Sequence, residues 1–528
     1  MTVCLSSEVC PEIREYERFS TTCANAYVRP LMAGYLMRLR RRLDQAGLTS
    51  PLFLMMSGGG LTTLDHATRF PIRLVESGPA GGVILAGRIA HECDLPATLA
   101  FDMGGTTAKI CLLDAGEPER SRRFEVARMY RDLKGSGLPV RIPVVEMVEI
   151  GAGGGSIARV DAMRRITVGP DSAGAEPGPA CYGRGGTAPT VTDANVALGR
   201  IDPRRFAGGR IPLDTGKAAE ALSRAVGAPL GLDGHWPATG VSEIVEENMA
   251  NAARVHAIER GKVIDRYTMV AFGGGAPLHA GRLAEKLGIA RVIVPVGAGV
   301  GSAIGFLAAP IAYEVVRSWR VPLLGLELGE ANHLVANLRS EARAVVRLGA
   351  GDVATIETFL VDIRYLGQGH ELPMTLPNRP LTKEDLPYLR RRFEERYRQI
   401  YGLHLPDMAV EAVTWSVTVS TEPRPIEKLA PIEPRAAGPA GERRPVYEPA
   451  LGRLVDMPVY RRSELSPGSA VGGPAVIVED ETTTLVPSSF GATISRRGDI
   501  VMEARTSDSL PPPRGGGRGG GQDLGQDD

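Results

Sequence analysis

The chain has 528 residues, which exceeds the size at which a single hydrophobic core stops growing, so we expect two or three domains. Hydrophobic residues make up 43% of the chain and charged residues 23%, and 61 Lys and Arg residues balance 61 Asp and Glu residues. This balance excludes a global field that would recruit nucleic acid or an anionic membrane, so recognition must depend on local sites.

The cysteines and the apolar runs point to a soluble protein. The six cysteines are scattered, with no CxxC pair and no matching histidine spacing, which argues against a zinc site and against a disulfide framework. The first residues lack the basic start and apolar core of a signal peptide, and no apolar run approaches the roughly 20 residues needed to cross a bilayer. We therefore expect a cytoplasmic protein that has neither nucleic acid nor a membrane as a partner.

The first hundred residues predict two strands and two helices. A short strand is expected at 2–8 and a helix at 24–46, where apolar residues recur at helical spacing. Residues 51–56 (PLFLMM) predict a buried strand that ends in a glycine turn at 57–60 (SGGG). A helix of small residues is expected at 83–93, because small side chains allow close packing on a neighbour or contact with an anion.

The most informative stretch is residues 99–114 (LAFDMGGTTAKICLLD). Two apolar runs flank the turn 103–107, which predicts a strand, a tight Gly-Gly turn and a second strand. Paired glycines allow an anion to approach the backbone N–H groups, and the following threonine hydroxyls can add hydrogen bonds. Asp102, at the end of the first strand, could hold a hydrated divalent cation. An ordinary hairpin fits the same spacing, so both interpretations stay open at this point.

Two later strands also break into glycine turns. They lie at 146–155 (EMVEIGAGGG) and at 267–275 (YTMVAFGGG), and a helix is expected after the second at 278–287. A strand, a glycine turn and a helix can contact a nucleotide, because glycine lets a base or ribose approach the backbone. The signatures GxGxxG and GxxxxGK[ST] are absent, which argues against a Rossmann fold and a P-loop NTPase. Four strands that end in glycine turns favour a shared phosphate or nucleotide crevice.

The character of the chain changes after residue 309. Strands are expected at 317–326, 354–367 and 410–421, and helices at 330–347 and 386–401. Short strands with Gly and Pro turns are expected at 452–503.

Three other segments are informative by their composition. Residues 168–202 are too dense in Gly and Pro for regular structure, which predicts a long ordered loop. Residues 422–446 read as a Pro-rich connector, and residues 506–528 cannot bury a core and are expected to be disordered. His370 follows a predicted strand, where it could line a substrate site or form a structural hydrogen bond.

Several strings of this sequence together closely resemble the hydantoinase A/5-oxoprolinase family. They are FDMGGTTAKI, ESGPAGGVILAG, IGAGGGSIARVD, VGPDSAGAEPGPACYGRGGTAPTVTDANVALGRID and AFGGGAPLHAGRLAEKLGI, and the resemblance extends from residue 3 to residue 503. Members of this family include ATP-dependent lactam hydrolases and the nucleotide-binding subunits of acetone and acetophenone carboxylases. The resemblance implies an α/β fold with the ribonuclease-H-like lobes of the actin, sugar kinase and heat-shock ATPase superfamily.

The resemblance also implies ATP and Mg²⁺ as cofactors and gives roles to two of the glycine turns. The FDMGGTT turn is similar to a phosphate loop whose contacts would be Asp102, Gly104, Gly105, Thr106 and Thr107. Within that loop, the implied metal ligand is Asp102, and the implied catalytic residues are Asp102 and Thr106. The AFGGGAP turn resembles an adenosine motif, with Gly273, Gly274 and Gly275 near the nucleoside.

The implied chemistry is phosphorylation of an amide or carbonyl oxygen by ATP, which makes a small cyclic amide or ketone substrate reactive. A hydantoinase B-type partner subunit would then carry out hydrolysis or carboxylation. We therefore expect the ATP-binding subunit of a hydantoinase/5-oxoprolinase-type hydrolase. A nucleotide-binding subunit of an acetone/acetophenone-type carboxylase and a non-catalytic actin-like binding module are the alternatives.

The resemblance divides the chain into four parts. We expect a remnant of the first lobe with the interlobe connection at 1–96, an ATPase-like core lobe at 97–312, a smaller α+β, β-rich C-terminal domain at 313–505, and the tail. Family members carry an earlier phosphate loop of the DxGGTxTD kind, and no such string occurs in residues 1–98. The first lobe is therefore expected to be incomplete at the N-terminus. A separate first-lobe polypeptide as a further partner, a truncated start and a decayed family member are alternatives that the sequence leaves open.

Overall fold

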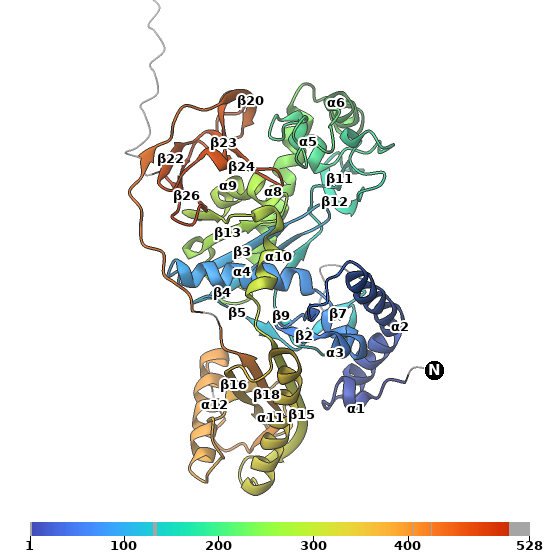
Figure 1. Cartoon of the computed structure of the whole chain (residues 1–528), viewed down its shortest axis with the longest axis vertical. Coiled ribbons are helices and arrows are strands. Elements are labelled where there is room, and N and C mark those ends of the chain that lie inside the picture. Colours follow the sequence, from blue (N-terminus) through green and yellow to red (C-terminus); the bar gives the residue numbers. More distant parts are fainter. Residues whose placement is uncertain (1–2, 130–134, 404, 424, 506–528) are drawn as a thin grey trace, which may run out of the picture.

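The computed structural model describes residues 3–129, 135–403, 405–423 and 425–505. The disordered tail expected at 506–528 lies outside these residues. The three largest sheets have ten, four and four strands. Figure 1 shows the ten-stranded sheet in the upper part of the view and one of the four-stranded sheets in the part below it.

The central sheet is built around the predicted hairpin. Its strands follow the order β10-β4-β3-β13-β14-β26-β25-β22-β19, with β5 beside β4. The first five are β10 (Val148–Ile150), β4 (Ala108–Asp114), β3 (Ala97–Met103), β13 (Thr268–Phe272) and β14 (Arg291–Val294). β4 runs antiparallel to both of its neighbours, β10 and β3, whereas β13 and β14 continue parallel to β3. Counted among themselves, these strands lie in the order 3-2-1-4-5 of a ribonuclease-H-like lobe, which confirms the expected α/β fold.

The last strands of the chain extend this same sheet. β26 (Ile500–Ala504) pairs antiparallel with β14, and β25 (Phe490–Ile494) and β22 (Ser469–Gly472) follow beyond it. The other strands of this region form a four-stranded sheet, which consists of β20 (Glu442–Glu448), β21 (Arg453–Arg461), β23 (Ala475–Val478) and β24 (Thr483–Val486). The strands expected at 452–503 are therefore present. The division of the chain at residues 96, 312 and 505 stays a prediction.

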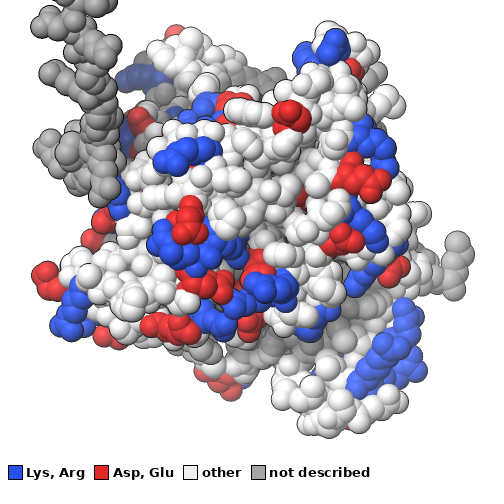
Figure 2. Space-filling model, turned by 90° about the horizontal axis from the view of Figure 1, so that it is seen from above, with Lys and Arg blue, Asp and Glu red and all other residues white. Residues whose placement is uncertain are grey.

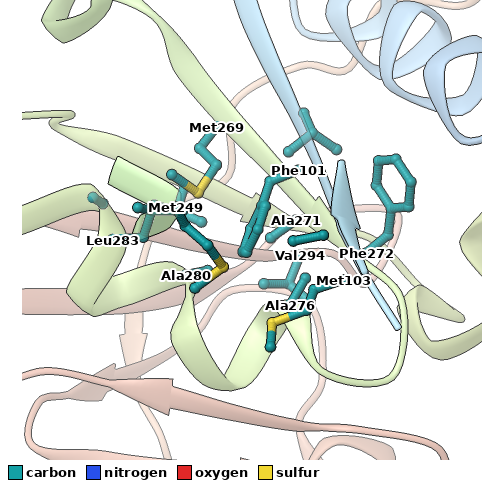
Figure 3. Packing of buried hydrophobic residues seen from close by; sticks show 14 of the residues in the cluster. Phe101, Met103, Met249, Met269, Ala271, Phe272, Ala276, Ala280, Leu283 and Val294 are labelled. Atoms are coloured by element: carbon teal, nitrogen blue, oxygen red, sulfur yellow. The ribbon is translucent and has the colours of Figure 1, made fainter. Parts of the chain in front are cut away.

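Helices cover both faces of the central sheet (Figure 1). α4 (Ser77–Glu92) packs on β3 and β4, whereas α9 (Ala276–Leu287) packs on β13 and β14 across the sheet, beside α8 (Trp236–Ile258). Figure 3 shows Met249 and Leu283 of these helices beside Phe101 and Met269 of the strands, and all four side chains are fully buried. The edge of the sheet that carries the glycine turns therefore rests on a closely packed apolar core.

Two helices of small residues cross at glycines. A Cβ atom on Gly305 of α10 (Gly301–Ala308) would lie 1.8 Å from the carbonyl oxygen of Gly81 in α4, and a Cβ atom on Gly81 would lie 2.3 Å from the ring of Phe306. Real side chains do not fit at such distances, so the two helix backbones touch directly. The small-residue helix expected at 83–93 is confirmed and begins earlier, at Ser77.

The start of the chain differs from the expectation. The strand expected at 2–8 is wrong for the described residues 3–8; Ser6–Val9 form the short helix α1, in which Glu8 pairs with Arg69 at 2.8 Å. Ser6 accepts hydrogen bonds from Arg18 of the following helix α2 (Glu15–Gln45), so contacts with distant residues override the strand preference of residues 2–8.

A separate four-stranded sheet follows α10. It has the order β15-β18-β16-β17 and is covered by α11 (Leu328–Ala350) and α12 (Asp385–Tyr401). Its strands are β15 (Ala312–Pro322), β18 (Val410–Thr421), β16 (Thr355–Tyr365) and β17 (Leu372–Thr375). The strand predicted at 410–421 has these bounds in the structure, because its long apolar alternation leaves no other register.

The prediction of a loop over residues 168–202 is wrong at both ends of that range. Its first residues continue β12 (Ile166–Ser172), and α5 (Val191–Ala197) begins within it. Thr190 and Asp193 form a capping box that starts α5, and the density of glycine and proline conceals this local signal.

The remaining elements are short. They are β1 (Phe53–Met55), β2 (Leu61–Thr63), α3 (Leu64–Arg69), η1 (Pro71–Leu74), β5 (Glu117–Pro118), β6 (Arg120–Ser121), β7 (Phe124–Val126), β8 (Leu138–Val140), β9 (Val144–Val145), β11 (Ser156–Val160), η2 (Ala180–Tyr182), α6 (Thr215–Leu222), η3 (Ser223–Gly227), α7 (Ala228–Leu230), η4 (Ile264–Arg266), η5 (Ala298–Val300), β19 (Arg435–Ala436) and η6 (Arg462–Glu464). Among the helices of the described residues, none is long and apolar enough to span a membrane. Figure 2 shows Lys and Arg side chains interspersed with Asp and Glu over the face that it presents.

The helix crossing gives a first prediction. Gly305→Ala should lower the free energy of unfolding by about 1–3 kcal/mol, because the added methyl group forces α10 away from α4. Urea unfolding followed by circular dichroism measures this loss. Gly329→Ala is the matched control, since nothing lies within 4 Å of a Cβ atom at that helical position. Equal unfolding midpoints for Gly305→Ala and the unmodified chain would contradict direct backbone contact at the crossing.

Candidate functional site

The turn between β3 and β4 is a closed hairpin loop. Met103 lies opposite Ala108 at the end of the ladder, and the N–H group of Gly104 donates to the carbonyl oxygen of Thr107 at 3.1 Å. Gly104, Gly105 and Thr106 are exposed. The backbone at the tip of the loop is therefore accessible to a ligand.

A second glycine turn leaves the sheet beside the first. The parallel pairing of β13 with β3 places Phe272 opposite Asp102, so the next residues of both strands emerge at the same edge. The N–H group of Gly275 donates to the carbonyl oxygen of Met103 at 2.9 Å. Gly273 has a φ of 93°, and a Cβ atom there would lie 2.5 Å from the same oxygen. The close approach of the two turns requires glycine at residue 273.

A third glycine turn supports the hairpin loop from behind. The N–H groups of Gly154 and Gly155 donate to the carbonyl oxygens of Gly104 and Gly105, at 3.1 and 2.6 Å. A Cβ atom on Gly153 would lie 2.5 Å from the backbone of Thr106. Three of the four glycine turns noted in the sequence thus meet. The fourth, at 57–60, lines a different cavity.

The turns open onto a cavity with a volume of about 930 Å³. Gly104 and Gly105 line one wall and Gly274 and Gly275 line the adjacent wall. The opposite walls come from residues that the sequence did not point to, at 201–209, 461–465 and 478–483. Figure 3 shows Met103, at the end of β3, next to Ala276, at the start of α9. This volume is within the range of pockets that bind small ligands and cofactors.

The other predicted residues lie beside the cavity. Asp102, Thr106, Thr107 and Gly273 do not line it. The hydroxyl of Ser302, from α10, donates to Oδ2 of Asp102 at 3.0 Å. Burial raises the pKa of Asp102, and the hydrogen bond from Ser302 and the charge of Lys109 oppose this rise only in part. Asp102 is therefore a partly buried carboxyl group held in one orientation at the base of the turns.

A buried polar cluster that the sequence analysis missed lies under the cavity. His279 is fully buried, and its Nδ1 lies 2.9 Å from Oε1 of Glu246 while its Nε2 lies 3.1 Å from Nδ2 of Asn195. Arg200 donates to Ser242 at 2.6 Å and to Glu246 at 3.3 Å. Burial raises the pKa of Glu246, but the hydrogen bond from His279 and the charge of Arg200 together outweigh this effect. The net result is a pKa below the usual value of a glutamate.

Two members of this cluster, Asn195 and His279, line the cavity, so the cluster fixes part of its floor. The sequence placed His279 on a helix but gave no sign of its partners, which come from two other helices.

The turns fit an anion better than they fit a bare metal ion. Within the described part of the chain, the N–H groups of Gly105, Thr106 and Gly274 have no hydrogen-bond acceptor, and no Cβ atom obstructs the approach to the glycines. Backbone N–H groups without an acceptor at glycine-rich turns can bind phosphate oxygens. No group of three or more His, Cys, Asp or Glu side chains that could hold a metal occurs among the described residues. A magnesium ion here would need phosphate and water as further ligands beside Asp102.

Comparison with known proteins decides the family. The hydantoinase/oxoprolinase profile matches residues 18–315, and the profile of the hydantoinase/oxoprolinase C-terminal domain matches residues 342–497. The chain belongs to the hydantoinase/oxoprolinase family. The alpha subunit of caprolactamase from Pseudomonas jessenii is 34% identical over 492 residues, which make up 92% of this chain and 69% of that subunit.

Two solved structures share this fold. ATP-dependent caprolactamase from Pseudomonas jessenii superposes with a TM-score of 0.78 and 31% identity, over 95% of this chain and 72% of that one. Nucleotide-free acetone carboxylase superposes with a TM-score of 0.77 and 26% identity, over 95% of this chain and 71% of that one. The hydantoinase/oxoprolinase fold is therefore shared with one amide-hydrolysing and one carboxylating enzyme, both described as ATP-dependent.

The environment of Asp102 gives a second prediction. Because its pKa is raised in the folded chain, ionised Asp102 reduces stability above that pKa, and this cost disappears as the pH falls below the unfolded value. Asp102→Asn keeps an oxygen for Ser302 but removes the buried charge. Without nucleotide, the variant should be more stable than the unmodified chain at pH 7, and the difference should shrink as the pH is lowered to 4.

Urea unfolding over this pH range measures the difference, with the exposed Asp233→Asn as the control that should show none. Lower stability of Asp102→Asn at pH 7 would contradict the assignment of a buried, uncompensated charge.

Proposed function

We propose that this chain is the ATP-binding subunit of an ATP-dependent cyclic amide hydrolase that opens a lactam or hydantoin ring. The observation that carries the proposal is the meeting of three glycine turns at one cavity, with N–H groups that have no acceptor among the described residues. Similarity to the caprolactamase alpha subunit supports the reaction class. A hydantoinase B-type subunit would complete the enzyme.

In this proposal the two cavity walls divide the nucleotide between them. At the hairpin loop, Gly105 offers its N–H group to a phosphate oxygen from the cavity wall, and Gly104 leaves room for the ligand. The N–H group of Thr106 and the hydroxyl of Thr107, next in the loop but outside the cavity lining, bind further phosphate oxygens. On the adjacent wall, Gly274 and its neighbours Gly273 and Gly275 face the nucleoside.

Asp102 and Thr106 have the catalytic roles. Asp102 would hold the water ligands of a magnesium ion, and the hydroxyl of Thr106 would donate a hydrogen bond to the transferred phosphate. ATP supplies a phosphoryl group that activates the amide oxygen, so that the ring carbon becomes open to attack. Phosphoryl transfer also needs positive charge on the side of the γ-phosphate that faces away from the hairpin loop. We assign that role to residues outside this cavity, from a partner polypeptide that carries a first lobe.

A specific observation favours one alternative. The superposition on acetone carboxylase is almost as close as that on caprolactamase. The same site would then activate a ketone for carboxylation, with ATP used in the same way. The two functions differ in their carbon substrate and in the need for bicarbonate, so product analysis separates them.

Nucleotide binding gives a third prediction. Gly274 has open space around its Cβ position, with the nearest atom, the oxygen of Glu481, at 3.7 Å, and it lines the cavity. Gly274→Leu should therefore fold normally and fill the nucleoside wall, which weakens MgATP binding at least about tenfold in isothermal titration calorimetry. Gly329→Leu, at an exposed helix position, is the matched control. Unchanged affinity in Gly274→Leu would place the nucleotide elsewhere.

Turnover gives a fourth prediction. We expect ATP hydrolysis when the chain is combined with a hydantoinase B-type subunit, a first-lobe polypeptide and a cyclic amide such as caprolactam or hydantoin. Asp102→Ala should abolish it, and Asp233→Ala should not. The assay measures the release of phosphate and of the ring-opened product in the same reaction. A parallel reaction supplies acetone and bicarbonate in place of the cyclic amide.

Full activity of Asp102→Ala would refute the role of Asp102. Dependence on acetone and bicarbonate would identify the carboxylase alternative. Nucleotide binding without turnover on any substrate would identify a non-catalytic module.

A further inference from the structure

A second cavity lies away from the glycine-turn cavity and shares no lining residue with it. It has a volume of about 540 Å³. Segments distant in the sequence form its walls: the glycine turn 57–60, residues 120–123 from the connection between β5 and β7, and one side of the sheet that contains β15, β16 and β18. This cavity is not part of the proposed nucleotide site.

Arginine dominates its charged lining. Five arginines and three carboxylates contribute, namely Arg73, Arg120, Arg122, Arg123 and Arg141 with Glu314, Asp362 and Glu371. Some of these groups neutralise one another: Arg122 pairs with Glu314 and lies 3.7 Å from Asp362, and Arg123 lies 3.6 Å from Glu371. Positive charge remains in excess.

Two arginines have hydrogen-bonding capacity that the protein does not use. Arg141 is only 8% exposed and pairs through Nε and Nη2 with Glu12, at 2.9 and 2.8 Å. Its Nη1 has no hydrogen-bond partner among the described residues, although an unpaired donor of a buried guanidinium is costly. Arg120 is exposed, lines the cavity and forms no ion pair with any described residue.

The carboxylates of the lining do not cancel the excess of positive charge in the cavity. Burial raises the pKa of Asp362 to about 6 against the opposing effect of Arg122, with the nearby Glu12, Glu371 and Glu314 adding to the rise. Near neutral pH this group therefore takes up a proton readily when another anion approaches, which reduces the repulsion that the anion meets.

The network also has a structural role, because it joins the N-terminal segment to the sheet. Arg14 pairs with Glu371 at 2.7 Å, and Arg73 lies over the ring of Tyr313 at 4.9 Å. A purely structural network would pair its buried donors. Arg141, whose Nη1 has no partner among the described residues, and Arg120 line the same cavity, so both are available for a further role.

The remaining lining includes apolar side chains. Met56, Leu360 and Pro373 line the cavity beside the arginines. Guanidinium groups match the geometry of carboxylate and phosphate oxygens. We propose that this cavity binds a small organic anion whose carboxylate or phosphate group is held by Arg120 and Arg141 and whose apolar chain packs against these side chains. His370 also lines the cavity and is placed to contact the ligand.

Isothermal titration of the full chain tests this inference with four probes: hexanoate, hexyl phosphate, inorganic phosphate and hexylammonium. We expect hexanoate or hexyl phosphate to bind with one-to-one stoichiometry, inorganic phosphate to bind at least tenfold more weakly, and hexylammonium not to bind. The stronger of the first two identifies the head group.

Variants locate the site. Arg120→Ala removes an exposed side chain that forms no ion pair, so the variant should fold normally and bind the organic anion about tenfold more weakly. Arg141→Lys keeps the charge but removes the unpaired Nη1, and it should weaken binding of the anion by a similar factor. Arg443→Ala, which removes an exposed arginine paired with Asp456, is the matched control and should bind as the unmodified chain does. MgATP affinity should be unchanged in all three variants.

Three results would overturn the inference: no binding of either organic anion at 10 mM, unchanged affinity in both cavity variants, or inorganic phosphate binding as tightly as the organic anions. Because MgATP binding is measured separately, failure here is distinguishable from failure of the proposed function.

Discussion

The proposed nucleotide site depends on the parallel pairing of β3 with β13. This pairing sets Asp102 opposite Phe272, so two glycine turns leave the sheet at one edge. The turns then approach until the N–H group of Gly275 reaches the oxygen of Met103 at 2.9 Å, which a side chain on Gly273 would prevent. The site is thus shaped by backbone atoms on a buried core, and backbone donors held in this way need no rearrangement when they meet a phosphate.

Distant parts of the chain complete this arrangement. Ser302 connects Asp102 to α10, whose glycine contact with α4 lies directly beside it in the fold. The last strand, β26, pairs with β14, and this brings residues 461–465 and 478–483 over the glycine turns as a wall of the cavity. The end of the sequence is therefore needed for a site whose recognisable motifs lie in its middle.

The sequence predicted correctly those elements of the fold that a local residue pattern determines. The hairpin around residues 103–107, the helices and β18 follow from apolar periodicity, and the family strings implied the ribonuclease-H-like lobe that the strand order confirms. The short helix at Ser6–Val9 was missed because distant contacts decide it. The far wall of the cavity, the cluster of His279 with Glu246, and the arginine cavity were also missed, since each gathers residues that are far apart in sequence and carry no common spacing. The roles of Asp102 and the glycines stay predictions.

The most direct test of the central claim is a crystal structure of this chain with Mg²⁺ and a non-hydrolysable ATP analogue. The account predicts the nucleoside against Gly274 in the cavity of about 930 Å³ and the phosphates at the hairpin loop, against the N–H groups of Gly105 and Thr106. An analogue bound in the arginine cavity, or anywhere else with the glycine turns free, would contradict it.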